Sequence, residues 1–188
     1  MDFEQIYDEL KSKRPSFYKY PNPVQVYLHW TGGHGYTTFS DYHFCIDRDG
    51  EIISTKPLDE IPSATWHRNT GSIAIALCGC YGAMAYRYDD GSLYAKLGDE
   101  APTDLQIESL AQLMYMISDV FGIPIDENHF ITHAEVAEID DYDLDSDDPD
   151  PRWDLAVLQD EDVWMTGGDI LRGKAVFYKN EFEQGKIN

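Results

Sequence analysis

Residues 72–78 read SIAIALC, a short and nearly continuous apolar run. A run of this length suits a β-strand that is buried on both faces of a sheet. Residues 24–30 (VQVYLHW) are rich in β-branched and aromatic side chains and predict a second strand, which stops at a Thr-Gly-Gly sequence. Residues 42–47 and 51–55 flank an Asp-Gly pair and predict a hairpin. Residues 128–132 predict one more short strand, so we expect these strands to meet in a central sheet.

The clearest helical pattern lies between residues 103 and 122, where large apolar side chains recur at helical spacing. Thr103 followed by Gln106 has the form of a capping box, which marks the start of a helix. Gly122 is the residue type that commonly follows the last turn. The sequence therefore predicts a long helix with both ends marked.

The remaining segments complete the predicted fold. Helices are also expected at about residues 3–12, at about 168–183 and, as a short segment, from Trp153. The Gly- and Tyr-rich residues 80–102 predict an excursion or a short hairpin. Strands followed by a long helix and a further strand indicate the α/β class. We expect a single domain over residues 1–188, with its core at about 24–158, in which helices flank a central mixed sheet.

Length, charge and cysteine content exclude several classes of protein. A chain of 188 residues fits one domain, and we expect a monomer. A net charge of −21 argues against binding to nucleic acid or to an anionic membrane surface. No apolar run approaches the length of a membrane span, and the first residues do not have the pattern of a signal peptide, so we expect a cytoplasmic protein where it is made. Three cysteines without a Cys-x-x-Cys pair argue against a disulfide framework and a cysteine-rich zinc cluster.

Two histidines occupy the same kind of position in the predicted sheet. His29 lies at the end of one strand and His133 at the end of another, each just before a predicted loop. Sites in open α/β sheets are built at the ends of strands. Two imidazoles with one carboxylate form the ligand set of an open catalytic zinc site. A single histidine is more often a surface or hydrogen-bonded core residue, so spacing alone leaves that alternative open.

Five segments extend this observation: VYLHWTGG, YHFCIDRDGEI, TWHRNTGSIAIALCG, ITHAEVA and DPDPRWDL. Their order resembles that of zinc-dependent N-acetylmuramoyl-L-alanine amidases, a superfamily that includes phage amidase lysozymes, bacterial recycling amidases and peptidoglycan recognition proteins. The resemblance covers roughly residues 24–158. It implies a peptidoglycan amidase-like fold, one zinc ion per chain, and peptidoglycan or muropeptides as the substrate. The implied reaction is hydrolysis of the amide bond between N-acetylmuramic acid and L-alanine, in cell-wall lysis or turnover.

The resemblance also implies which residues hold the metal. His29 and His133 match the two histidine ligands. The third family ligand is an Asp or Cys placed just before a proline, which falls on Asp148, with Asp150 as the rival because a proline follows it too. Asp154 is expected to be a structural carboxylate at a helix cap.

The resemblance also suggests roles for Tyr42 and His67, and the chemistry and position of other side chains suggest roles for Glu135, for two arginines and for two tryptophans, which could equally be packing residues. Tyr42 aligns with the tyrosine of the YHF motif and would steady an oxyanion, although a half-buried strand tyrosine is the alternative. His67 would contact the substrate or stabilise the intermediate. Glu135, two residues after His133, would face the site as a further catalytic group. The residues expected to bind the substrate are two aromatic walls and two cations: Trp30, Trp66, Arg68 and Arg152.

Two departures from the family keep other functions open. The recycling-type enzymes carry a glutamate where this chain has Ala76, and many members carry a lysine two residues before the third ligand, where this chain has Ser146. A non-catalytic peptidoglycan-binding domain and a zinc amidase or peptidase for another acyl-peptide are therefore the alternatives. The aspartates from Asp141 onward resemble the start of a calcium loop, but they lack the glycine and glutamate of an EF-hand and favour a solvated loop.

Overall fold

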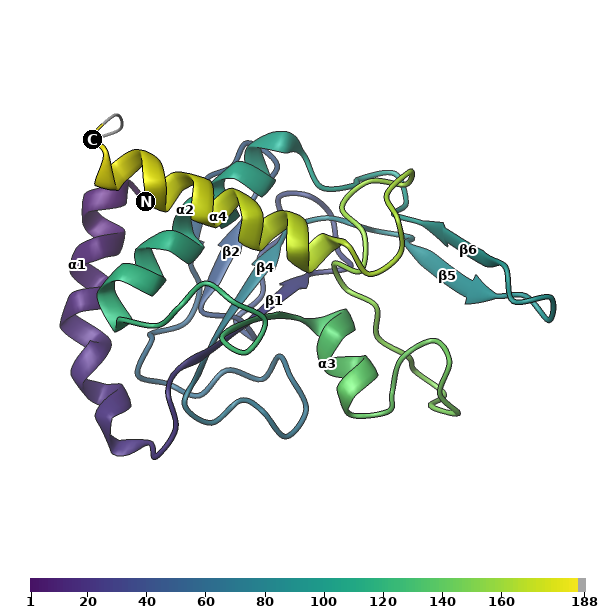
Figure 1. The fold of residues 1–188 in the computed structure, drawn as a ribbon, viewed down its shortest axis with the longest axis horizontal. Coiled ribbons are helices and arrows are strands. Elements are labelled where there is room, and N and C mark those ends of the chain that lie inside the picture. The colour runs from purple at the N-terminus through teal and green to yellow at the C-terminus, as the bar shows by residue number, and fades with distance from the viewer. Residues whose placement is uncertain (186–188) are drawn as a thin grey trace.

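The computed structural model describes residues 1–185 and contains a five-stranded sheet with the strand order β3-β2-β4-β1-β7 (Figure 1). The hairpin strands β2 and β3 are antiparallel, and every other neighbouring pair is parallel. The strands are β1 (Gln25–Trp30), β2 (Phe44–Ile46), β3 (Ile52–Ser54), β4 (Ser72–Leu77) and β7 (Phe130–Thr132).

The apolar run at residues 72–78 becomes β4, which lies between β2 and β1. All six residues of β4 are buried, so the prediction of a strand covered on both faces is confirmed. Parallel strands need this cover because the chain returns across the faces of the sheet between them. Since β1, β4 and β7 run in one direction, their carboxyl ends meet at one edge.

Four helices flank the sheet in a single domain: α1 (Phe3–Lys13), α2 (Asp104–Phe121), α3 (His133–Ile139) and α4 (Gly167–Glu183). In Figure 1, α4 and α2 cross in front of the sheet and α1 lies beside them. The capping box of Thr103 and Gln106 is present, and Gly122 ends α2 in the left-handed conformation, as predicted. A 3-10 turn, Arg14–Lys19, follows α1.

A separate two-stranded hairpin, β5 (Met84–Arg87) and β6 (Leu93–Lys96), extends away from the body of the domain (Figure 1). It lies within residues 80–102, where a short hairpin was one of the two expectations. None of the helices within residues 1–185 is both long and apolar enough to cross a membrane.

Two local predictions are wrong. The short helix expected from Trp153 is not formed, and Leu155 there has a positive φ of 60°, which no right-handed helix contains. His133 does not lead into a loop but is the first residue of α3. Thr132 caps this helix through a reciprocal pair of bonds with Glu135, so the sequence T-H-A-E is a capping box that the strand prediction overlooked.

His43 is a buried histidine outside the site, and its two hydrogen bonds fix it in the neutral form. Nδ1 accepts from the backbone N–H of Ala74 at 3.1 Å, and Nε2 donates to the carbonyl of Glu60 at 3.0 Å. Burial lowers the pKa of His43 from 6.5 to about 4. Protonation would place an N–H on Nδ1 against the N–H of Ala74, so the folded state resists it.

We expect this histidine to make the protein less stable in acid. Between pH 6.5 and about 4 the unfolded state binds more protons than the folded state, so stability present above pH 6.5 is lost as the pH falls. The shift corresponds to about 3 kcal/mol of unfolding free energy. Urea unfolding at pH 7, 6 and 5 would measure about 2 kcal/mol of this loss, since the rest follows only below pH 5. His43→Asn should be less stable at pH 7 but lose less stability on acidification, and equal slopes for the two proteins would contradict the prediction.

Candidate metal centre

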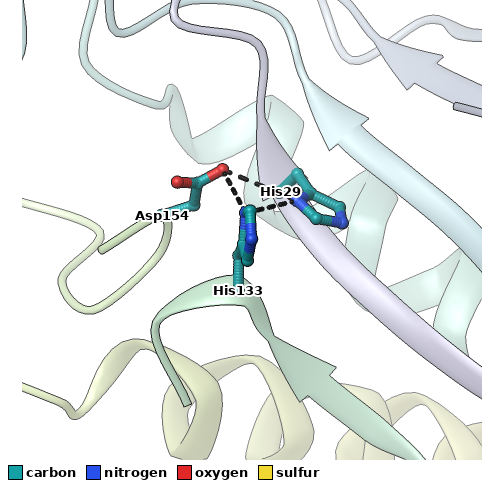
Figure 2. A group of neighbouring side chains, drawn as sticks. All are labelled: His29, His133 and Asp154. Carbon is teal, nitrogen blue, oxygen red and sulfur yellow. Dashed lines mark hydrogen bonds and ion pairs between the residues drawn. The ribbon is translucent and has the colours of Figure 1, made fainter. Parts of the chain in front are cut away.

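Three buried side chains meet at the carboxyl edge of the sheet: His29, His133 and Asp154 (Figure 2). The Nδ1 atoms of the two histidines lie 3.1 Å apart. Oδ2 of Asp154 lies 3.3 Å from Nδ1 of His133 and 3.5 Å from Nδ1 of His29. Figure 2 shows the three side chains pointing toward one another from β1, from the start of α3 and from a loop. Three donor atoms therefore form a nearly equilateral triangle.

The register of the sheet brings the two histidines together. Leu28 of β1 pairs with Thr132 of β7, so the next residues, His29 and His133, leave the same edge side by side. The loop that carries Asp154 is tied to α3, because the N–H of Ala134 donates to the carbonyl of Asp154 at 3.1 Å. The positions of all three side chains thus depend on backbone hydrogen bonds.

The donor set and its spacing fit a tetrahedral metal ion. Zinc binds imidazole nitrogen and carboxylate oxygen at about 2.0–2.2 Å, which places neighbouring ligand atoms about 3.3–3.6 Å apart in a tetrahedron. The separations of 3.3 and 3.5 Å fall within this range, and the separation of 3.1 Å between the two histidine nitrogens lies just below it. Two imidazoles and one carboxylate leave a fourth position for water or substrate, as in catalytic zinc sites.

The charges of the group are also those that a cation requires. Burial lowers the pKa of His29 to about 4, so its imidazole is neutral at pH 7. Burial alone would raise the pKa of Asp154, but the neighbouring His133 and His29 hold the pKa of this carboxyl well below its usual range. The site therefore presents a carboxylate anion and a neutral His29 at neutral pH, the protonation states of metal ligands.

The group opens on a cleft of about 540 Å³. His133 and Asp154 line its floor, and aromatic, acidic and basic side chains line its walls. The residues of the walls that bear on function are Trp30, Tyr42, Trp66, Tyr142, Asp148, Asp150 and Arg152. Such a concave, partly apolar space with a few convergent polar groups is typical of a substrate site.

Tyr42 lies beside the histidines. Its ring centroid is 5.3 Å from that of His29, and its hydroxyl donates to the carbonyl of Trp30 over a long 3.4 Å. Burial raises the pKa of Tyr42 above its ordinary range, so the phenol keeps its proton and remains a donor. Trp30 itself is nearly buried and packs edge-on against Trp153, so it forms part of the wall.

Asp148, the predicted third ligand, does not join the histidines. It is exposed, and its carboxylate accepts from the N–H of Asp150, whose own carboxylate pairs with Arg152 at 2.6 Å. Asp154, predicted to cap a helix, lies beside the two histidines instead and is the N-cap of no helix among residues 1–185. The overlooked signal is its setting in the apolar stretch WDLAVL, because a carboxylate buried among apolar residues needs a partner.

Glu135, predicted as a further catalytic group, is not among the residues that line the cleft and is engaged elsewhere. Its carboxylate accepts two hydrogen bonds from the Arg172 guanidinium, at 2.7 and 3.1 Å, and one from the N–H of Thr132. Arg172 also donates to the carbonyl of Phe130. Glu135 therefore joins α4 to the start of α3 and supports His133 through the backbone.

His67 and Arg68 lie apart from the three-residue group, in a second cleft of about 560 Å³. His67 is exposed and packs against Trp66, with 4.0 Å between ring centroids. Arg68 forms a bidentate ion pair with Asp140, with both contacts at 2.6 Å. Trp66 lines both clefts and separates these two residues from the histidines.

Residues 19–152 match the family described as N-acetylmuramoyl-L-alanine amidase, which is most of the chain. The chain belongs to this amidase family. Comparison with curated proteins gives no match. Among solved structures, the Ph2119 endolysin from Thermus scotoductus MAT2119 bacteriophage Ph2119 is similar with 17% sequence identity and a TM-score of 0.40, over 64% of this chain and 82% of the endolysin.

The match to the amidase family includes His29, Tyr42 and His133 and ends just before Asp154. With Asp154 in the group, the residue two places earlier is Arg152 rather than Ser146. The amidase therefore has a cation where many members carry a lysine, and that cation lines the cleft.

The departure at position 76, where this chain has alanine in place of a glutamate, remains in the structure. Ala76 of β4 pairs with His29 of β1, so it lies beside this histidine on the same face of the sheet. It packs there with Cys45 and Cys78 in a small apolar cluster. The amidase thus has an apolar surface where the recycling-type enzymes carry a glutamate.

Sequence reasoning missed one residue that orients the group. Oγ1 of Thr65 lies 3.0 Å from Nε2 of His29, and both side chains are buried. A hydrogen bond on the second nitrogen of a histidine fixes the ring and its tautomer when the first nitrogen holds a metal. No local pattern identifies Thr65, because the contact joins residues 36 positions apart.

Proposed function

We propose that the protein is a zinc-dependent amidase that hydrolyses the bond between N-acetylmuramic acid and L-alanine in peptidoglycan. The observation that carries the proposal is the triangle of His29, His133 and Asp154, two members of which, His133 and Asp154, line the cleft, in a chain of the amidase family. The donor types, their spacing, the neutral form of His29 and the ionised form of Asp154 support zinc as the ion.

His29, His133 and Asp154 would hold the ion, with Thr65 orienting His29. When bound, zinc supplies Lewis-acid chemistry and makes water a nucleophile near neutral pH. Tyr42 would donate a hydrogen bond to the substrate carbonyl oxygen as negative charge develops on it. The phenolic hydroxyl has one hydrogen, so it would exchange its long 3.4 Å bond to the carbonyl of Trp30 for this contact.

The walls of the cleft supply contacts for the rest of the substrate. Arg152 would orient a substrate carboxylate, since a guanidinium can bind a carboxylate through two parallel hydrogen bonds. The side chain of Trp66 is 65% exposed and offers a flat surface to a sugar or peptide. His67 and Arg68, on the other side of Trp66, would contact substrate only if it extends into the second cleft.

Metal analysis combined with digestion of purified sacculi tests this function. We expect one zinc ion per chain and the appearance of new N-terminal alanine, with no other new terminus. Treatment with a chelator should abolish cleavage, and added zinc should restore it. Tight binding of muropeptides without metal or cleavage would identify a binding domain instead, and a different new terminus would identify another amidase or peptidase.

A further inference from the structure

The hydroxyl of Tyr142 is a buried polar group for which no protein atom among residues 1–185 provides a hydrogen-bond partner. The side chain is 7% exposed, although it belongs to the acidic segment that the sequence assigned to a solvated loop. Buried hydroxyl groups are nearly always paired in folded proteins, because leaving one unpaired lowers stability. This exception needs a physical reason.

The ring of Tyr142 is held firmly in the wall of the cleft. It packs in a small cluster with the buried side chains of Tyr27, Ile131 and Val136. Its centroid lies 5.9 Å from that of His133, in an edge-on arrangement. One aromatic ring therefore stands beside each histidine, Tyr42 beside His29 and Tyr142 beside His133, and both line the same cleft.

The surroundings of the hydroxyl select the kind of ligand it can meet. Burial is the main cause that raises the pKa of Tyr142 to about 12, and the nearby carboxylate of Asp140 adds to it. The hydroxyl is therefore a donor at neutral pH. Asp154 also raises the pKa of Tyr142, whereas the cations Arg68 and Arg152 lower it. These cations are already engaged with Asp140 and Asp150. A neutral oxygen is therefore a better acceptor here than a carboxylate.

Access of a ligand to this hydroxyl would depend on movement of Trp66, the exposed side chain that packs beside it. The Trp66 ring packs edge-on against Tyr142, with 6.4 Å between centroids, and it is 65% exposed. A tryptophan exposed to this degree can change its rotamer without unpacking the core.

We propose that Tyr142 is a substrate-binding residue of the cleft, whose hydroxyl donates a hydrogen bond to an amide carbonyl oxygen of the muramoyl peptide. The inference rests on the proposed amidase function and adds to it a specificity-determining contact beside His133. In this assignment the ligand provides the partner that the folded chain lacks.

Tyr142→Phe tests the contact, because it keeps the ring and removes only the hydroxyl. We expect KM for a soluble muramoyl pentapeptide, and Kd for the same peptide on zinc-depleted protein, to rise roughly ten-fold, the size expected for one buried hydrogen bond. The zinc content should stay at the wild-type value. The melting temperature should stay the same or rise, since an unpaired buried hydroxyl is removed.

Tyr178→Phe is the matched control, because the Tyr178 hydroxyl donates to Glu108 far from the cleft. Its melting temperature should fall by roughly 2–4 °C while KM and Kd stay unchanged. If Tyr142→Phe behaves like this control, the hydroxyl has a structural partner such as water and the inference is overturned. A loss confined to peptides with free carboxylates, and absent from amidated ones, would also overturn the assignment to a neutral oxygen.

The two measurements separate this inference from the proposed function. Normal cleavage by Tyr142→Phe with unchanged KM and Kd would refute the inference and leave the amidase function intact. A wild-type protein that binds the peptide without cleaving it, and binds it more weakly after Tyr142→Phe, would support the contact and refute the activity. No cleavage and no binding by the wild type would overturn both.

Discussion

Asp154→Ala is expected to abolish stoichiometric zinc binding and, with it, measurable amidase activity. The carboxylate supplies the one negative charge in the group, at 3.3 and 3.5 Å from the two histidine nitrogens. Loss of a residue that only supports a ligand costs roughly 10- to 100-fold in metal affinity, so loss of the ligand itself should cost more. Zinc content after gel filtration and release of N-terminal alanine from sacculi would measure both effects.

Asp148→Ala and Asp150→Ala are the matched controls, because each removes one carboxylate from the same cleft. Both side chains are exposed, and neither reaches the histidine nitrogens in the three-residue group. We expect both variants to retain one zinc ion. Asp150→Ala should alter only substrate affinity, since it frees Arg152 from an ion pair at 2.6 Å. Loss of zinc from Asp148→Ala, with retention in Asp154→Ala, would restore the assignment made from the DPxPRW pattern.

The sheet and the two histidines could be predicted because both depend on local sequence. The apolar run of β4 needs burial on both faces, and the end of β1 is marked by two glycines directly after Thr31. Once parallel strands are assumed, their ends must meet at one edge, which brings His29 and His133 together. Neither step requires knowledge of a distant contact.

The third member of the group could not be predicted in this way. Which aspartate returns to the histidines depends on the path of the chain after α3, and that path is set by contacts between distant residues. The positive φ of Leu155 and the bond from Ala134 to the carbonyl of Asp154 turn this carboxylate inward. The bidentate ion pair of Glu135 with Arg172 joins residues 37 positions apart. The structural role of Glu135 could therefore not be predicted from local sequence either.

Tyr42→Phe is expected to keep zinc and to lower kcat by roughly 10²–10³-fold, the cost of removing one hydrogen-bond donor to a developing oxyanion. KM should change little, because the contact would strengthen only as charge develops on the carbonyl oxygen. The stability of the folded protein should change little, since the hydroxyl makes only one long hydrogen bond, of 3.4 Å, to the carbonyl of Trp30. Steady-state kinetics beside zinc analysis and thermal unfolding would separate these effects.

The pH dependence gives this prediction a second readout. Burial raises the pKa of Tyr42 above its ordinary value of 10.0, so the phenol remains protonated through neutral and mildly alkaline pH. A donor is lost only as the pH rises through its pKa, so the ratio of wild-type to Tyr42→Phe activity should stay constant between pH 7 and about 9. A packing role would instead lower the melting temperature and leave kcat unchanged, which would assign Tyr42 to the wall of the cleft rather than to the reaction.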